Sequence, residues 1–359
     1  MVNSVVKIFT ALAVSFTLGI MITPIVTNFL YKHKMWKTKA RNEGLGGGAT
    51  PLFNALHKER EVNTPRMGGI IIWVSVLLTV AFIWAIAQIF PNIATIKLNF
   101  LSREQVWLPL FTLIVASLIG LVDDYLQVRG GGSYVAGGLS LKKRVGLVLL
   151  IGLGCALWFY IKLGISTIGI PFVGNFDIGL LFIPLFMIVM LAVFSGGVID
   201  GIDGLSGGIF AAIFSAYAGI AFSQGQFDLS ALCATIVGGT LAFLWFNIPP
   251  ARFYMGETGI LGLTVCLSVV AFLTRQVLVL PIIAFPLLLA SGSDIIQILS
   301  KKFRGKKVFL IAPIHHHFEA LGWPPYKVTM RFWILSIIFA TVGMVISIMG
   351  SYAIWPIVI

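Results

Sequence analysis

Ten apolar stretches of helical length divide this chain, and they restrict its fold more than any other feature. Of the 359 residues, 58% are hydrophobic and 11% are charged, whereas soluble domains carry about 25% charged residues. A bilayer-crossing helix needs about 20 apolar residues, and only helices or closed barrels satisfy their backbone inside lipid. We therefore expect an all-α polytopic membrane protein with about ten transmembrane helices, at residues 5–31, 67–89, 105–122, 143–164, 178–195, 205–223, 229–248, 259–274, 276–299 and 331–358.

No polar stretch suggests a separate soluble domain, so residues 1–359 are expected to form a single integral membrane domain. The first apolar stretch is longer than the core of a secretory signal and lacks a small-residue cleavage pattern, which favours a first span. The three cysteines lie inside apolar stretches, with no spacing typical of a metal site or a disulfide.

The basic residues predict how the chain is oriented. Of the 25 Lys and Arg residues, 20 lie in the odd-numbered loops between the stretches and four in the even-numbered loops. The positive-inside rule places the odd loops in the cytoplasm, so both termini are expected on the outer face. This asymmetry, with attraction to anionic lipid and to an anionic ligand, accounts for the net charge of +12, and no nucleic-acid partner is expected.

Acidic residues are scarce, and their positions point to a site. Six of the 13 form a pattern, and all six lie in odd loops or at their membrane edges: Asp123, Asp124, Asp200, Asp203, Glu257 and Glu319. Carboxylates at a membrane edge are costly and are therefore candidate functional groups. We expect an active site on the cytoplasmic face.

The motif GLVDDY ends the third span with Asp123 and Asp124, where the helix dipole disfavours negative charge unless a cation is near. Adjacent helical residues point about 100° apart, so the two should serve different partners: one a metal, the other a base or a lysine. A solvated acidic helix end is the alternative.

The motif DGIDG places Asp200 and Asp203 at i, i+3, on one face of a helical turn, between glycines that let backbone approach a ligand. This arrangement suits Mg²⁺ or ribose hydroxyls, and a simple turn is the alternative. Downstream, Asn247, Tyr254 and Glu257 combine an amide, an aromatic ring and a carboxylate near one loop. A nucleobase could stack on Tyr254, and Glu257 is expected to bind a ligand.

The motif APIHHHFE carries His315, His316 and His317 at a cytoplasmic membrane edge. Three consecutive residues cannot share one helical face, which argues against a zinc site built from them alone. Phosphate contacts or proton transfer fit better, with a solvated loop as the alternative. The basic segment at 57–69 either holds an anionic substrate or is a positive-inside flank. Together these motifs predict Mg²⁺-dependent phosphoryl transfer to a lipid phosphate.

The order TPRMGG, GLVDDY, DGIDGL, FLWFN with MGETG, and APIHHHFE, over about residues 57–335, resembles the phospho-N-acetylmuramoyl-pentapeptide transferases. These belong to the polyprenyl-phosphate N-acetylhexosamine-1-phosphate transferases. The resemblance implies transfer of phospho-MurNAc-pentapeptide from its UDP carrier to undecaprenyl phosphate, giving lipid I and UMP, with Mg²⁺. It also implies a multi-pass protein of the bacterial inner membrane that serves peptidoglycan biosynthesis, cell shape and cell division, and it leaves a homodimer open.

The resemblance also implies roles for individual residues. The catalytic residues would be Asp123, Asp124, Glu257 and His315, and the metal ligands Asp123, Asp200 and Glu257. The substrate would be bound by Asp200, Asp203, Asn247, Tyr254, His316, His317, Lys143 and Arg144.

Several positions depart from the family pattern and mark a divergent member. Glu257 stands where the family has a metal-binding aspartate, Gln127 replaces a lysine, and Gly197 replaces an asparagine. One alternative is therefore a sister enzyme that transfers GlcNAc-1-phosphate or a related sugar phosphate to the same lipid. Another is a transporter or a catalytically silent relative, because carboxylates in membranes also relay ions.

Overall fold

The computed structural model describes residues 2–37, 64–102, 104–130 and 138–352. Residues 57–63 of the basic segment at 57–69 lie outside this part. Among the described residues, nine helices are long and apolar enough to cross a membrane. They are α1 (Val2–Lys32), α3 (Ile70–Ile89), α5 (Trp107–Val128), α6 (Leu141–Leu157, extended by a π-helical turn to Lys162), α7 (Phe182–Ser195), α8 (Leu205–Ser223), α9 (Phe227–Asn247), α10 (Gly256–Leu273) and α14 (Pro325–Tyr352). The expected polytopic all-α fold is confirmed.

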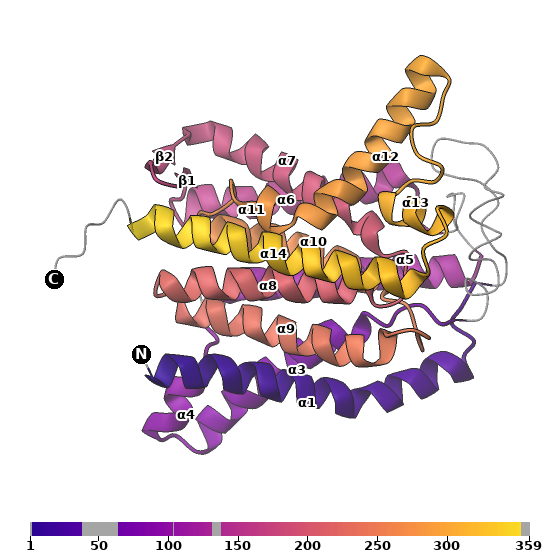
Figure 1. Ribbon diagram of the computed structural model, residues 1–359. Coiled ribbons are helices and arrows are strands. Elements are labelled where there is room, and N and C mark those ends of the chain that lie inside the picture. The colour runs from indigo at the N-terminus through magenta and orange to yellow at the C-terminus, as the bar shows by residue number, and fades with distance from the viewer. Residues whose placement is uncertain (1, 38–63, 103, 131–137, 353–359) are drawn as a thin grey trace.

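The ninth expected span, 276–299, is not one continuous helix. Its residues form the short α11 (Leu280–Ile283) and the separate α12 (Phe285–Arg304), divided at Ala284. Pro286 lies at the start of α12, where a proline is tolerated because the first helical N–H groups have no partner within the helix. The pair still carries the chain back along the bundle, so that the start of α1 and the end of α14 lie at the same end (Figure 1).

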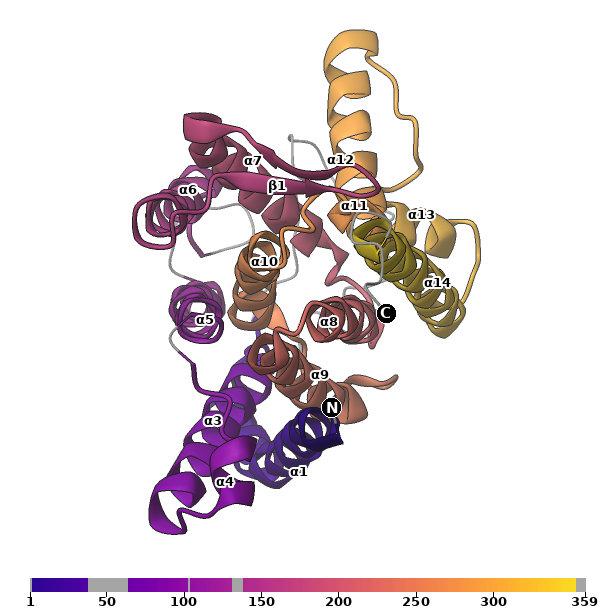
Figure 2. The same cartoon turned by 90° about the vertical axis from the view of Figure 1, so that its left-hand side faces the viewer.

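Helix α10 is the centre of the bundle. All of its residues except Glu257 are buried, and α5, α7 and α8 surround it (Figure 2). A helix that is apolar on every side belongs in such a central position. By contrast, α1 and α14 lie at the periphery and expose apolar residues such as Phe9 and Ile337, as helices that face lipid do.

Small residues let α5 and α10 pack closely next to the carboxylates of GLVDDY. A Cβ added at Gly120 would lie 2.2 Å from the carbonyl oxygen of Glu257, and one added at Gly262 would lie 2.0 Å from Ser117 Oγ. Small residues at helix contacts are how membrane helices gain van der Waals contact without a hydrophobic driving force. The contact fixes Glu257 beside the end of α5.

The remaining elements are short. Two helices, α4 (Ile93–Leu98) and α13 (Ile314–Ala320), lie between the longer ones, and 3₁₀ turns cover Gly179–Leu181 and Gly196–Ile199. An antiparallel hairpin of β1 (Thr167–Ile170) and β2 (Gly174–Asp177), which the sequence did not predict, lies at the end of the bundle that holds the termini (Figure 1). There, Gly169 N donates to the carbonyl of Arg275.

Replacing Gly120 by alanine should destabilise the bundle. The added methyl group would push α5 and α10 apart, and overpacking of this kind costs about 1–3 kcal/mol. The matched control is Gly154→Ala in α6, because a Cβ at Gly154 meets no atom within 4 Å. Thermal unfolding in detergent should show a lower midpoint for Gly120→Ala and no decrease for Gly154→Ala. Equal midpoints for the two variants would contradict the packing described here.

Candidate active site

The residues singled out in the sequence gather at the end of the bundle opposite the termini. The end of α5, the start of α6, the loop before α8, the start of α10 and α13 meet there (Figure 1). Asp123, Asp124 and Asp203 are buried at this end, as are His315 and His316. Buried charges must be paired or hydrogen-bonded, so the partners of each define the site.

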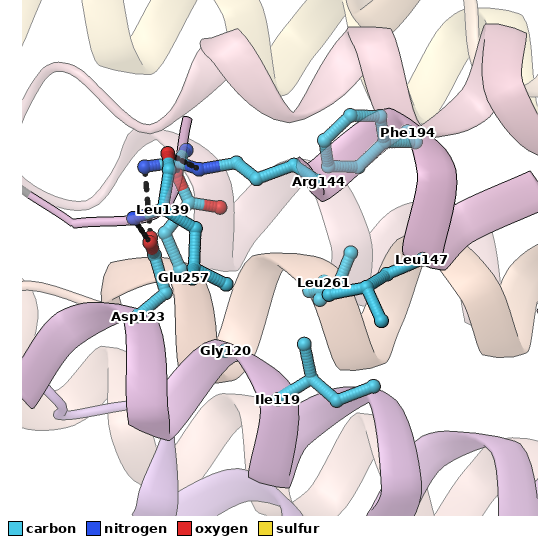
Figure 3. A pocket seen from close by; sticks show the side chains of 9 residues that line it. All are labelled: Ile119, Gly120, Asp123, Leu139, Arg144, Leu147, Phe194, Glu257 and Leu261. Atoms are coloured by element: carbon cyan, nitrogen blue, oxygen red, sulfur yellow. Dashed lines mark hydrogen bonds and ion pairs between the residues drawn. The ribbon is translucent and has the colours of Figure 1, made fainter. Parts of the chain in front are cut away.

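Arg144 joins two of the predicted carboxylates (Figure 3). Its Nη2 lies 2.8 Å from Asp123 Oδ2, and its Nη1 pairs with Glu257 Oε1. Asp123 also accepts hydrogen bonds from Gln127 Nε2, at 2.9 Å, and from the backbone N–H of Leu139. A planar guanidinium suits two carboxylates approached at once, so Arg144 is the cation expected near the end of α5.

Asp124 has a different partner, as the sequence predicted for the pair. Both of its oxygens accept backbone N–H groups at the start of α10, from Glu257 and from Thr258, each at 3.0 Å. A helix N-terminus carries unpaired N–H groups and a partial positive charge. Asp124 therefore caps the start of α10 with both of its carboxylate oxygens.

Asp200 reaches the same helix start from the other side. Its Oδ2 accepts Gly256 N at 3.2 Å, and its Oδ1 accepts Ser206 Oγ at 2.8 Å. Burial raises the pKa of Asp200 to about 6, against the opposing effects of the Ser206 hydrogen bond and the positive charge of Arg66. Asp200 is thus a carboxyl group that can change charge just below neutral pH.

Asp203 and Asn247 form hydrogen bonds with backbone groups of neighbouring loops. Asp203 Oδ2 accepts the N–H of Ala251 at 3.1 Å. Asn247 Oδ1 accepts the N–H of Gly204 at 2.9 Å, and its Nδ2 donates to the carbonyl of Phe253 at 2.8 Å. These two side chains clamp the DGIDG turn to the loop before α10, so both act as positioning residues.

The loop before α10 is also tied to the TPRMGG segment. Tyr254 N donates to the carbonyl of Pro65, and the carbonyl of Tyr254 accepts the N–H of Gly68, both at 2.8 Å. The Tyr254 side chain is half-buried. Its stacking on a nucleobase stays a prediction, but the backbone pairing fixes its place beside the site.

Helix α13 brings two of the three histidines against the DGIDG turn. A Cβ at Gly201 would lie 2.5 Å from His316 Nε2 and 2.8 Å from His315 Nε2. His316 Nδ1 and Glu319 Oε2 are 2.6 Å apart. His317 points elsewhere, because its Nδ1 accepts the N–H of Leu310 at 3.2 Å. The absence of a shared face, expected from consecutive positions, is confirmed.

Two further basic residues lie near the site. Lys143 is exposed at the start of α6, one position before the inward Arg144. Arg66, quoted in a motif but not chosen as a site residue, donates to Gln127 Oε1 at 3.2 Å, and its charge acts on Asp200. No spacing rule singles out Arg66, but its place in a segment that precedes an apolar stretch was the available signal.

A pocket with a charged part and an apolar part opens beside Arg144 (Figure 3). Asp123, Arg144 and Glu257 supply its polar groups. Its apolar wall consists of Ile119, Leu139, Leu147, Phe194 and Leu261, together with Gly120. Charged and apolar side chains thus meet at one point beside the end of α5.

The three predicted metal ligands are brought near the start of α10 but do not form one cluster. In the part of the chain that the structure describes, no three His, Cys, Asp or Glu residues are grouped to hold an ion. Arg144 binds Asp123 and Glu257, and Asp200 lies on the other side. Carboxylate oxygens are nevertheless the type of ligand that Mg²⁺ prefers. Of the two carboxylates that pair with Arg144, Glu257 is the more accessible, with 25% of its side chain exposed.

The fold and site define a class: a polytopic membrane enzyme with a carboxylate- and arginine-rich centre at one end of a helical bundle. Residues 106–275 match the family model described as glycosyl transferase family 4. The chain is 33% identical over 348 residues to a phospho-N-acetylmuramoyl-pentapeptide-transferase of Geobacillus sp. (strain WCH70), covering 94% of this chain and 97% of that protein.

Proteins of the same name from two other bacteria agree. The Rickettsia akari protein is 31% identical over 93% of this chain and 91% of its own length. The Bartonella quintana protein is 35% identical over 79% of this chain and 80% of its own length. This chain belongs to the phospho-N-acetylmuramoyl-pentapeptide transferase family, whose members transfer a sugar phosphate from a nucleotide carrier to a polyprenyl phosphate.

Replacing Asn247 by alanine should lower the free energy of unfolding by about 2 kcal/mol, since it leaves a buried N–H and a buried carbonyl without partners. Asn175→Ala, at an exposed position in β2, is the control and should change stability by no more than about 0.5 kcal/mol. Denaturant unfolding in detergent measures both values. A variant at Asn247 as stable as the one at Asn175 would rule out the clamp.

Proposed function

We propose that this enzyme transfers phospho-MurNAc-pentapeptide from UDP-MurNAc-pentapeptide to undecaprenyl phosphate, forming the first lipid-linked peptidoglycan precursor and UMP. The observation that carries the proposal is the Arg144 centre, where an arginine and two carboxylates meet an apolar pocket at one end of a membrane bundle. The names of the relatives, aligned over nearly the whole chain, support the choice of substrate. The setting is the cytoplasmic face of a bacterial inner membrane, in cell-wall synthesis.

In this proposal the lipid phosphate attacks the β-phosphorus of the UDP-sugar. A new oxygen–phosphorus bond forms, the bond from that phosphorus to the bridging oxygen breaks, and UMP leaves. Arg144 supplies a fixed positive charge for the phosphate groups, and Asp123, hydrogen-bonded beside it, takes up the proton of the lipid phosphate. Asp124 keeps α10 in place, since both of its oxygens are already engaged.

Mg²⁺ is the metal of this proposal, and Asp123, Asp200 and Glu257, which do not form one cluster without it, would be the carboxylates that hold it. When bound, it would neutralise charge on the pyrophosphate. His315 and His316, against the DGIDG turn, would contact the phosphates, and Tyr254 would pack on the uracil ring.

A sister activity on UDP-GlcNAc is the second candidate, because the same carboxylates would serve it. The test is UMP release by the purified chain with undecaprenyl phosphate and Mg²⁺, given each nucleotide sugar separately. Turnover with UDP-MurNAc-pentapeptide alone is the expected result. Turnover with UDP-GlcNAc alone would replace the proposal with the sister activity, and silence with both, in a preparation that binds UDP, would indicate a catalytically silent relative.

Arg144→Gln should lower kcat/KM by at least about 100-fold, because a preorganised charge on a transferring phosphoryl group is worth that much or more. Arg144→Lys should lose less activity because an ammonium keeps the positive charge, although it lacks the planar fork with which the guanidinium holds both carboxylates. Lys97→Gln, exposed in α4 at the other end, is the control. A variant without Arg144 that turns over like the Lys97 variant would remove Arg144 from the mechanism.

The affinity for Mg²⁺ should fall as the pH drops through about 6. Below its pKa of about 6, Asp200 is protonated and neutral, and a proton competes with a cation for the same oxygens. Between pH 7 and pH 5 the apparent affinity, measured by calorimetry with UDP-MurNAc-pentapeptide present, should fall about tenfold. Asp200→Asn should bind weakly at both values, and an unchanged pH dependence in that variant would exclude Asp200 as the titrating group.

A further inference from the structure

Helix α12 leaves the bundle sideways at the end that carries the active site. After the break at Ala284 it runs outward, and its last turns extend beyond α14 and α7 (Figures 1 and 2). The chain returns from its tip to α13. The outer half of α12 is thus placed where few other elements cover it.

The inner face of α12 is polar, and its side chains form hydrogen bonds with the segment that follows the helix. Gln297 accepts the N–H groups of Val308 and Phe309 and donates to the carbonyl of Phe309, at 2.9–3.0 Å. Ser300 Oγ donates to the carbonyl of Lys306, and Ser293 Oγ accepts the N–H of Ile314. These bonds fasten the returning segment to α12, so the helix and this segment form one unit.

The outer face of α12 is apolar. Leu288, Ile295, Leu299 and Phe303 lie at spacings of four or seven residues and are 47–74% exposed. Helical residues at these spacings share a face. Beyond the bundle this face has hydrocarbon as its natural surroundings, because an exposed apolar strip beside a membrane domain is unfavourable in water.

The end of α12 and the turn after it carry a dense positive charge. Five basic residues fall within seven positions, and all are exposed: Lys301, Lys302, Arg304, Lys306 and Lys307. No Asp or Glu occurs between positions 295 and 318. None of the five forms an ion pair with another residue in the described ranges. We call this group the basic tip.

We propose that the basic tip binds the headgroups of anionic phospholipids while the outer face of α12 lies in the acyl chains beneath them. An amphipathic helix with basic residues and large apolar side chains takes this position at a membrane interface. Each basic residue near an anionic surface adds to the attraction. The apolar strip runs into the basic tip at Phe303, which favours lipid over a free polyanion. This inference does not depend on the proposed transferase activity.

The experiment compares bound phospholipids on the full chain. The purified protein is incubated with equimolar phosphatidylglycerol and phosphatidylcholine in detergent, and native mass spectrometry counts each bound lipid. The wild type should prefer phosphatidylglycerol. A variant with all five basic-tip residues changed to Gln should lose at least about tenfold of that preference, as expected when several surface charges are removed.

A matched control keeps the change in net charge equal. It converts the exposed and scattered Lys32, Lys34, Lys97, Arg129 and Lys162 to Gln and should retain the preference. Equal loss in both variants, or no preference in the wild type, would overturn the proposal. Inorganic phosphate is the last arm: if phosphate at the same concentration removes the bound lipid, the basic tip is a phosphate site and not a lipid site. Equal thermal midpoints would show that both variants are folded.

Discussion

The start of α10 is the constraint on which the site depends. Asp124 accepts the N–H groups of Glu257 and Thr258, and Asp200 accepts that of Gly256 from the opposite side. A buried carboxylate is costly alone, but the unpaired N–H groups and partial positive charge of a helix N-terminus compensate it. The central helix is therefore held at its first turn by the end of α5 and by the loop before α8, two segments that are distant from each other in sequence. Glu257 is positioned as a result.

The groups expected to react are connected to this first turn by successive contacts. Glu257 projects from α10 towards Arg144, and Arg144 in turn holds Asp123 on α5. Because Gly120 allows α5 to approach α10 closely, the three side chains can meet beside an apolar pocket. The DGIDG turn, fixed by Asn247, places Gly201 against His315 and His316.

Sequence reasoning predicted the elements well and the partners poorly. Apolar length predicted the spans because lipid leaves few other folds, and the angle between adjacent helical residues predicted separate partners for Asp123 and Asp124. That the partner of Asp124 is backbone could not be predicted, since its donors lie more than 130 positions away. The hydrogen bonds of the Asn247 amide to Gly204 and Phe253 were not predicted, and its expected contact with substrate stays a prediction. Strands of four residues, as in the hairpin, leave too little periodicity to detect.

Helix α12 has its polar face towards the protein and its apolar face outward, and this arrangement also affects how the chain enters the membrane. Gln297 and Asp294, with the lysines at its end, make this helix a weak signal for insertion when it is considered alone. Its polar inner face is satisfied only once residues 306–314 have folded back onto it. The ninth expected span must therefore be completed together with the strongly apolar helices on either side, α10 and α14. Membrane integration of this region is a cooperative event, in which a later segment determines the placement of an earlier one.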